Sequence, residues 1–389
     1  MPKGLLSVVA GNTPDVRGAV VDQLLRAAPN AVVLAVSIHG ADAGYPVVQR
    51  FLSGADPALR DAAAQGATGD PVVILRQDLM AVRRAAGRPH VVLALPEDLD
   101  VLPFLVELWR PRVGSGSLGD HYDPAPLLVG VDPESFMADI GCVHRAVRLW
   151  DGDDRGDPLT PAEIAARQVE AADALLIPEP GIGPAASGAV ALAGHLNGQA
   201  LLLPPAGAEL PSPLLRPAPP GCGDRWRSRL EPVTVPSLRR GRHEGVASVL
   251  WRARRPLHPE RLAGALPAVM FGVVRSRGHL WLTSRPDTVV TWRSAGAHLE
   301  LREADRWLEE ASPRAWEAAT PQRRTLASWF WHDYYGERRN ELVFTGIDLD
   351  DQRIRSALDA ALLTDAELAL GREGWTAIPD PLLSDAETS

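Results

Sequence analysis

The sequence of 389 residues is poor in lysine and cysteine, with one lysine, Lys3, and two cysteines, Cys142 and Cys222. Two isolated cysteines exclude a disulfide framework and a cysteine-based metal cluster. No apolar run reaches the roughly 18 residues that a membrane helix needs. The start of the chain has no charged leader followed by an apolar stretch. We therefore expect a cytoplasmic protein with no membrane partner.

Charge is unevenly distributed along the chain, whose formal net charge is -9. Acidic side chains outnumber basic ones in residues 1–205 and 347–389, whereas residues 206–346 are net basic. A basic segment of this kind is typical of a surface for a polyanion such as RNA. Ordinary solvated arginine on a sheet face explains it equally well. No DNA partner is expected.

The first 25 residues resemble a phosphate-binding strand, loop and helix. Residues 5–10 form an apolar run that predicts a buried strand, residues 11–18 a turn, and residues 19–25 the apolar face of a helix. A phosphate loop would carry Gly, Lys and Ser or Thr at positions 16 to 18, to bind phosphate oxygens and Mg²⁺. The chain has Val16, Arg17 and Gly18 there. The architecture of a nucleotide switch is retained, and its chemistry is altered.

Strand and helix patterns alternate up to residue 203 and then change. The alternation predicts an α/β domain over residues 1–205, with a mostly parallel sheet covered by helices on both faces. Prolines crowd residues 206–244, which we expect to be an extended linker without a helix. Residues 245–372 predict a smaller α+β domain with antiparallel strands, including a turn at residues 276–278. Residues 373–389 form an acidic tail, with disorder expected at its end.

Four segments of this second domain resemble the CobW C-terminal domain. They are RRPLHPERLAGAL, VVRSRGHLWLTSRP, YYGERRNELVFTGIDLD and ALLTDAELA, at residues 254–266, 273–286, 334–350 and 361–369. The departures are mild, with Arg277 in place of a lysine and Glu337 in place of an aspartate. Proteins of this family are P-loop GTPases, so the resemblance implies a P-loop NTPase-like fold for residues 1–205.

The resemblance also implies where nucleotide contacts would lie. Gly11 matches the family loop, and Asn12, Arg17 and Gly18 occupy its remaining phosphate-facing positions. Glu97 follows the buried strand at residues 90–95, where an acidic residue would contact Mg²⁺ or its water. Alternatively, Glu97 and Asp98 are the polar start of the next helix.

Two further family motifs are replaced. Glu179 lies where the family reads guanine with an aspartate, and could substitute for it only if its proline-bounded turn aimed it correctly. The cysteines of the family's metal motif are replaced by Asp70, Val72 and Val73, which cannot supply a zinc site. GTP and Mg²⁺ therefore remain open as ligands, the zinc site is absent, and no catalytic residue is predicted.

Two functions follow from this pattern, beside a scaffold whose partner is unrelated to ribosomes or metals. The first is a non-hydrolysing adaptor, resembling a divergent actinobacterial branch of the family that includes proteins recruiting a ribosome hibernation factor under zinc limitation. A protein partner, with the ribosome or a hibernation factor as candidates, is expected. The alternative is an active GTP-dependent metallochaperone in zinc or cobalt homeostasis. Of the tryptophans, Trp251, Trp281, Trp292 and Trp331 lie in predicted elements and are expected in the core.

Overall fold

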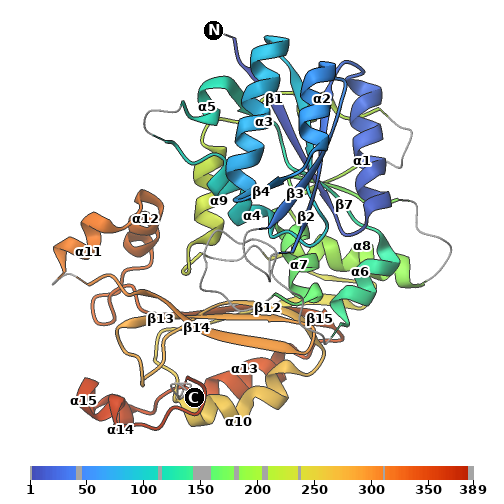
Figure 1. Ribbon diagram of the computed structural model, residues 1–389. Helices are drawn as coiled ribbons and strands as arrows, with labels where there is room; N and C mark the ends of the chain where they lie inside the picture. Colours follow the sequence, from blue (N-terminus) through green and yellow to red (C-terminus); the bar gives the residue numbers. More distant parts are fainter. Residues whose placement is uncertain are drawn as a thin grey trace. The chain divides into compact units, whose positions relative to one another are not determined.

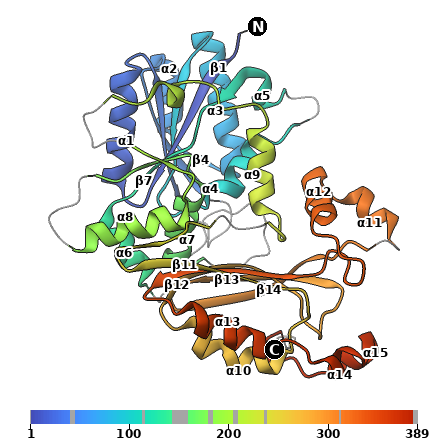
Figure 2. The same ribbon diagram turned by 180° about the vertical axis from the view of Figure 1, so that it is seen from behind.

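The computed structural model describes residues 2–40, 46–112, 116–142, 159–178, 184–203, 209–234, 238–309 and 312–383. The chain divides into two compact units, Met1–Arg227 and Ser228–Ser389 (Figures 1 and 2). The first is an α/β unit and the second a smaller α+β unit, as the sequence predicts. Within the described ranges, every helix is too short or too polar to cross a bilayer.

The first unit is built on a sheet in the order β4-β3-β2-β5-β1-β7-β8-β9, with β6 also pairing with β1. The pairs β2–β3 and β3–β4 are antiparallel and the others are parallel. Its strands are β1 Gly4–Gly11, β2 Val32–His39, β3 Val47–Ser53, β4 Ala67–Thr68, β5 His90–Ala94, β6 Tyr122–Pro124, β7 Leu128–Gly130, β8 Ala174–Leu176 and β9 Leu201–Leu202. Strand β1 is buried along almost its whole length, as expected for a central parallel strand.

Helices cover both faces of this sheet, and Figure 1 shows α1 and α3 on opposite sides of it. On the α1 face, Val20 and Leu24 pack against Val9, Val92 and Leu128 of the sheet. The helices are α1 Pro14–Ala27, α2 Pro57–Ala64, α3 Pro71–Ala86, α4 Val101–Leu108, α5 Leu118–His121, α6 Pro133–Ile140, α7 Pro161–Ala171, α8 Pro184–Leu196, the 3-10 turn η2 Ser212–Leu215 and α9 Cys222–Leu230.

The second unit is an antiparallel sheet in the order β10-β11-β15-β12-β13-β14. Its strands are β10 Arg242–His243, β11 Val246–Ala253, β12 Val273–Leu280, β13 Thr288–Ala295, β14 His298–Arg306 and β15 Asn340–Ile347. Its helices are α10 Pro259–Met270, α11 Pro313–Ala318, α12 Pro321–Trp329, α13 Asp351–Ala360, α14 Asp365–Leu368 and α15 Gly371–Thr376. Helices α10 and α13 pack on one face of this sheet, as Figure 2 shows.

The tryptophans of the second sheet are core residues, as the sequence predicts. Trp251, Trp281 and Trp292 are buried, and the Trp292 ring meets Phe344 edge to face with centroids 6.2 Å apart. Trp331 is only half-buried. Trp329, by contrast, is exposed, with an exposed fraction of 78%. Trp329 is not among the tryptophans that sequence analysis named.

The expected linker at residues 206–244 is wrong in one respect, because it contains η2 and the nine-residue helix α9. The prolines flank α9 rather than interrupt it, so its backbone N–H groups remain free to bond within the helix. Trp226 of α9 is buried, with its ring centroid 6.4 Å from that of Trp109. The acidic tail also begins in a helix, α15, where Trp375 is buried; residues 384–389 lie outside the described ranges.

The turn expected at residues 276–278 is also wrong, because β12 runs through it without a break. Gly278 pairs with both Trp292 of β13 and Leu342 of β15. A Cβ at Gly278, where φ is +152°, would lie 1.9 Å from the backbone oxygen of Glu341. Glycine is therefore required there by the close approach of a neighbouring strand, and not by a turn.

Candidate functional site

The candidate site lies at the carboxyl edge of the parallel sheet, where β1 leads into α1. Only Asn12 and Thr13 separate the strand from the helix, which begins at Pro14 and not at residue 19 as expected. Thr13 is the N-cap, because its Oγ1 accepts a hydrogen bond from Val16 N at 3.3 Å. Pro14 at the first helical position favours this start. The turn expected at residues 11–18 is therefore mostly helix.

The backbone donors of this connection are largely used within the chain. Asn12 N donates to Gly130 O at 3.4 Å, and Arg17 N donates to Thr13 O at 3.1 Å. Pro14 has no N–H group, and Asp15 adds a negative charge to the first turn. A phosphate loop binds its ligand through backbone N–H groups that point to a common centre. These contacts leave few such donors between Gly11 and Arg17.

Asn12 joins the end of β1 to the end of β7. Its Oδ1 accepts from Asp132 N at 2.7 Å, and its Nδ2 donates to Asp132 O at 3.2 Å. Asp132 is in turn the N-cap of α6, where its Oδ1 accepts from Ser135 N. The predicted nucleotide contact of Asn12 is replaced by this pair of hydrogen bonds to the chain itself.

Arg17 is paired within the chain rather than free for a phosphate. Its Nη1 donates to the backbone oxygen of Leu95 at 2.7 Å and lies 3.0 Å from Oε1 of Glu97. Sequence analysis predicts Arg17 and Glu97 as separate ligand contacts, for phosphate and Mg²⁺. The structure brings them together as an ion pair at the sheet edge. Each side chain neutralises the charge with which the other would bind the nucleotide or its cation.

The two glycines of the expected loop have different surroundings. A Cβ on Gly11 would lie 3.1 Å from Arg17 N, so this position is tight because the chain turns directly into the helix. A Cβ on Gly18 would meet no atom within 4 Å, and Gly18 lies inside α1. Gly18 is therefore a helical residue with open space beside it, and not part of a turn.

The acidic segment after β5 is held by α7. Glu97 and Asp98 precede α4, whose N-cap is Asp100, so neither is in the first turn of that helix. Gln168 Nε2 donates to Glu97 O at 2.5 Å. Burial, followed by the nearby Glu97 carboxylate, raises the pKa of Asp98.

Arg167 of α7 forms a buried cluster of ion pairs beside this segment. Arg167 Nη1 donates to Oδ2 of Asp100 and Arg167 Nη2 to Oε1 of Glu163, each at 2.5 Å. Burial alone would lower the pKa of Arg167, but the Asp100 and Glu163 carboxylates outweigh it and raise that pKa. This cluster fixes the acidic segment against α7, and both of its carboxylates are paired with the same guanidinium group.

The positions of the family's metal motif are structural. Asp70 is the N-cap of α3, where its Oδ1 accepts from Val72 N at 2.8 Å and Val73 N at 3.4 Å. Within the described ranges, no three His, Cys, Asp or Glu side chains are grouped to hold a metal ion. Cys142 is half-buried and Cys222 is buried, and neither forms a disulfide. The predicted guanine contact, Glu179, lies outside the described residues.

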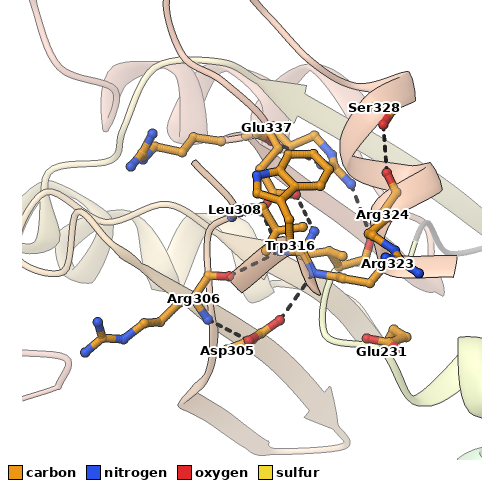
Figure 3. Close-up of polar contacts among 12 residues, drawn as sticks. Glu231, Asp305, Arg306, Leu308, Trp316, Arg323, Arg324, Ser328 and Glu337 are labelled. Atoms are coloured by element: carbon orange, nitrogen blue, oxygen red, sulfur yellow. Dashed lines mark hydrogen bonds and ion pairs between the residues drawn. The ribbon is translucent and has the colours of Figure 1, made fainter. Parts of the chain in front are cut away.

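In the second unit, the segment at residues 336–345 holds α12 to the sheet through Glu337 (Figure 3). Glu337 is fully buried and accepts hydrogen bonds from both Nη atoms of Arg323 on α12 and from Leu308 N. Asp305 of β14 lies 3.2 Å from Arg323 Nε. These contacts position α12, at whose end the exposed Trp329 lies.

Comparison with known proteins gives the family. The model of the cobalamin synthesis protein cobW C-terminal domain matches residues 246–362. A zinc chaperone of Mycobacterium tuberculosis is 30% identical over 313 residues, which are 79% of this chain and 76% of that protein. The zinc-regulated GTPase metalloprotein activator 1 of Dictyostelium discoideum is 34% identical over 166 residues, 42% of this chain and 34% of that protein.

Among solved structures, the Zn(II)-bound YjiA GTPase from E. coli is 12% identical and covers 93% of this chain and 100% of its own. Its TM-score of 0.37 is too low to support an inference. The sequence relatives are sufficient on their own. With 30% identity over most of both chains and a cobW C-terminal domain in its second unit, the chain belongs to the CobW family.

Proposed function

We propose that this chain is a CobW-family adaptor that does not hydrolyse nucleotide. The observation that carries the proposal is the pairing of Arg17 with Glu97 and with the backbone oxygen of Leu95. Phosphoryl transfer depends on positioning and on neutralising the charge of the phosphates and their Mg²⁺. Here the available cation and the available carboxylate neutralise each other, and α1 starts too early to leave a phosphate loop.

The adaptor acts in the cytoplasm by binding a protein partner. We propose the recruitment of a ribosome hibernation factor, or contact with the ribosome itself, as part of a response to zinc limitation. The exposed rings of Trp329 and Tyr334, with exposed fractions of 78% and 70%, support a protein contact on the second unit. Aromatic rings are enriched where proteins bind one another. The net basic segment at residues 206–346 supports contact with ribosomal RNA.

The nucleotide part of the proposal is tested by titrating the full chain with GTP and Mg²⁺ in a calorimeter. We expect no saturable, magnesium-dependent heat. Glu97→Gln is the informative variant, because it frees Arg17 from its carboxylate partner. Weak nucleotide binding that appears in this variant and not in the wild type supports the blocking role of the pair. Tight binding by the wild type contradicts the proposal.

The partner part is tested by sedimenting purified ribosomes with the chain at low salt, with and without a hibernation factor. We expect co-migration that weakens about tenfold or more in Trp329→Ala, since an interface aromatic contributes about 2 kcal/mol or more. Phe271→Ala is the matched control, because Phe271 is a similarly exposed ring of the same unit. Absence of co-migration, or equal loss in both variants, contradicts this part.

The second candidate is a GTP-dependent metallochaperone in zinc or cobalt homeostasis. It is favoured by the relatives named as a zinc chaperone and as a zinc-regulated GTPase metalloprotein activator. This function requires stoichiometric metal binding and saturable GTP binding. Equilibrium dialysis with Zn²⁺ and Co²⁺ distinguishes the two functions, since the adaptor is expected to retain less than one equivalent of either metal.

A further inference from the structure

An arginine-lined cavity lies in the first unit, and its lining includes no residue of the β1–α1 connection. Its volume is about 320 Å³, and its walls come from α3 and from the segment that follows α4. Val73, Arg76, Met80 and Arg84 repeat at helical spacing, so they share one face of α3. Small-ligand pockets have volumes from about 300 Å³ upward, so the cavity admits a compact molecule.

Four guanidinium groups line this cavity, from Arg76, Arg84, Arg110 and Arg112. In the described residues, these arginines form ion pairs with one carboxylate, that of Glu107. Its oxygens lie 3.1 Å from Arg110 Nη1 and 3.5 Å from Arg112 Nη2. Arg84 is exposed and forms no ion pair within the described part of the chain. The cavity therefore has an excess of positive charge.

Arg76 is held rigidly at the wall of the cavity. Its Nε donates to Leu108 O at 2.8 Å, and its Nη2 donates to Glu107 O at 2.5 Å and Arg110 O at 2.9 Å. These bonds cap the carboxyl end of α4. The remaining nitrogen, Nη1, is buried and has no acceptor in the described residues. A buried donor without an acceptor is costly, and an anion would satisfy it.

The electrostatic environment of Arg76 agrees with an anion site. Burial, followed by the neighbouring Arg112, lowers the pKa of Arg76. Glu107 opposes this effect and does not overcome it. Several like charges gathered around one partly buried cation are stabilised when a negative ligand binds among them.

We propose that this cavity binds a compact, phosphate-bearing small molecule. Guanidinium groups present forked donors that match the oxygens of a phosphate. Arg76 supplies a fixed donor, and Arg84, Arg110 and Arg112 add further guanidinium groups to the lining. Val73 and Met80 offer an apolar wall for the organic part. The site uses no residue of the Arg17–Glu97 pair, so it does not depend on the function proposed above.

The test is calorimetric titration of the full chain with inorganic phosphate and pyrophosphate at low salt. We expect saturable 1:1 binding, tighter for pyrophosphate. Arg84→Gln combined with Arg112→Gln is expected to weaken it by about tenfold or more, because each charge-assisted hydrogen bond contributes about 1.5–3 kcal/mol. Arg60→Gln is the matched control, since Arg60 is an exposed arginine on α2.

Circular dichroism spectra that match the wild type establish that the double variant is folded. Arg76 is left unchanged because it holds α4. Absence of saturable binding at millimolar pyrophosphate overturns the proposal. Equal weakening by Arg60→Gln, or equally tight binding of sulfate, also overturns it, because either result indicates general attraction to positive charge.

Discussion

Replacing Glu337 by Gln removes the negative charge at the centre of the buried network of the second unit. Arg323, its partner, is 2% exposed, and Glu337 itself is fully buried. Burial alone would lower the pKa of Arg323, but hydrogen bonds and charge from Glu337, then Asp305, raise it. In Glu337→Gln the guanidinium stays charged, and its strongest counter-charge is gone.

Removing one partner of a buried ion pair costs about 3–5 kcal/mol. Asp305 remains 3.2 Å from Arg323, and its side chain is 40% exposed, so it offsets part of this loss. A glutamine can also still accept the hydrogen bond from Leu308 N. We therefore expect the lower end of the range, about 3 kcal/mol of unfolding free energy.

The measurement is urea unfolding of the full chain, followed by tryptophan fluorescence, because eight of the 11 tryptophans lie in the second unit. Glu303→Gln is the matched control. Oε1 of Glu303 lies 2.6 Å from Nε of Arg285. The Arg285 side chain is 28% exposed and the Glu303 side chain 49% exposed. An exposed pair contributes about 0–1 kcal/mol.

A cost for Glu337→Gln no larger than that for Glu303→Gln would refute the reasoning. If the single variant does not fold, Arg323→Met with Glu337→Leu provides a second measurement. Replacing both members of a buried pair by apolar residues is often close to neutral. The double variant should therefore be more stable than the single one, and an equally unstable double variant would also count against the proposed role.

Three further predictions concern single residues. Gly278→Ala should lower the free energy of unfolding by about 3 kcal/mol or more, because its Cβ would clash with the backbone. Gly264→Ala, in open space on α10, should raise the free energy of unfolding by about 1 kcal/mol. Thermal unfolding tests both, and equal melting temperatures contradict the prediction. Asn12→Ala should cost about 1–3 kcal/mol in urea unfolding, through its two lost hydrogen bonds, and an unchanged midpoint refutes it. A hydrogen bond from Arg261 is the largest cause that lowers the pKa of Glu367 from 4.5 to about 2. The ionised Glu367 therefore contributes its full share of folding stability above pH 4.5 and loses it as the pH falls towards 2. The difference in stability between the wild type and Glu367→Gln should close over that window, and a constant difference refutes the prediction.

Much of the fold is predictable because its signals are local. Apolar runs locate the central strands β1 and β5, and the second capping box is confirmed, with Thr364 N donating to Glu367 Oε2 at 2.8 Å. The start of α7 after Thr160 is likewise confirmed. These features depend on side chains only a few residues apart.

The start of α1 was available in the sequence but masked by a competing pattern. Thr13-Pro14 is the same cap-and-proline signal as Thr160-Pro161, which correctly predicts α7. The spacing of Gly11 and Gly18 favours a phosphate loop instead. The local helix signal decides the structure here, because the loop has lost the residues that would stabilise its open form.

Other features depend on contacts between distant parts of the chain. The pairing of Arg17 with Glu97 joins the first turns of α1 to the segment after β5, 80 positions away, and sequence alone gives each residue a role but not the other as its partner. Gly278 is required by the backbone of β15, which a local window does not contain. The exposure of Trp329 likewise follows from how α12 is anchored by Glu337, and helical periodicity alone did not select it.

The early start of α1 has a consequence for anyone who would engineer a working nucleotide switch from this scaffold. Changing Val16, Arg17 and Gly18 to Gly, Lys and Thr would place the new side chains on a helix that is already wound, not in an open loop. The cap formed by Thr13 and Pro14 would have to be dismantled first. Rebuilding such a loop therefore requires unwinding a stable helical turn, which makes the change hard to reverse by stepwise substitution.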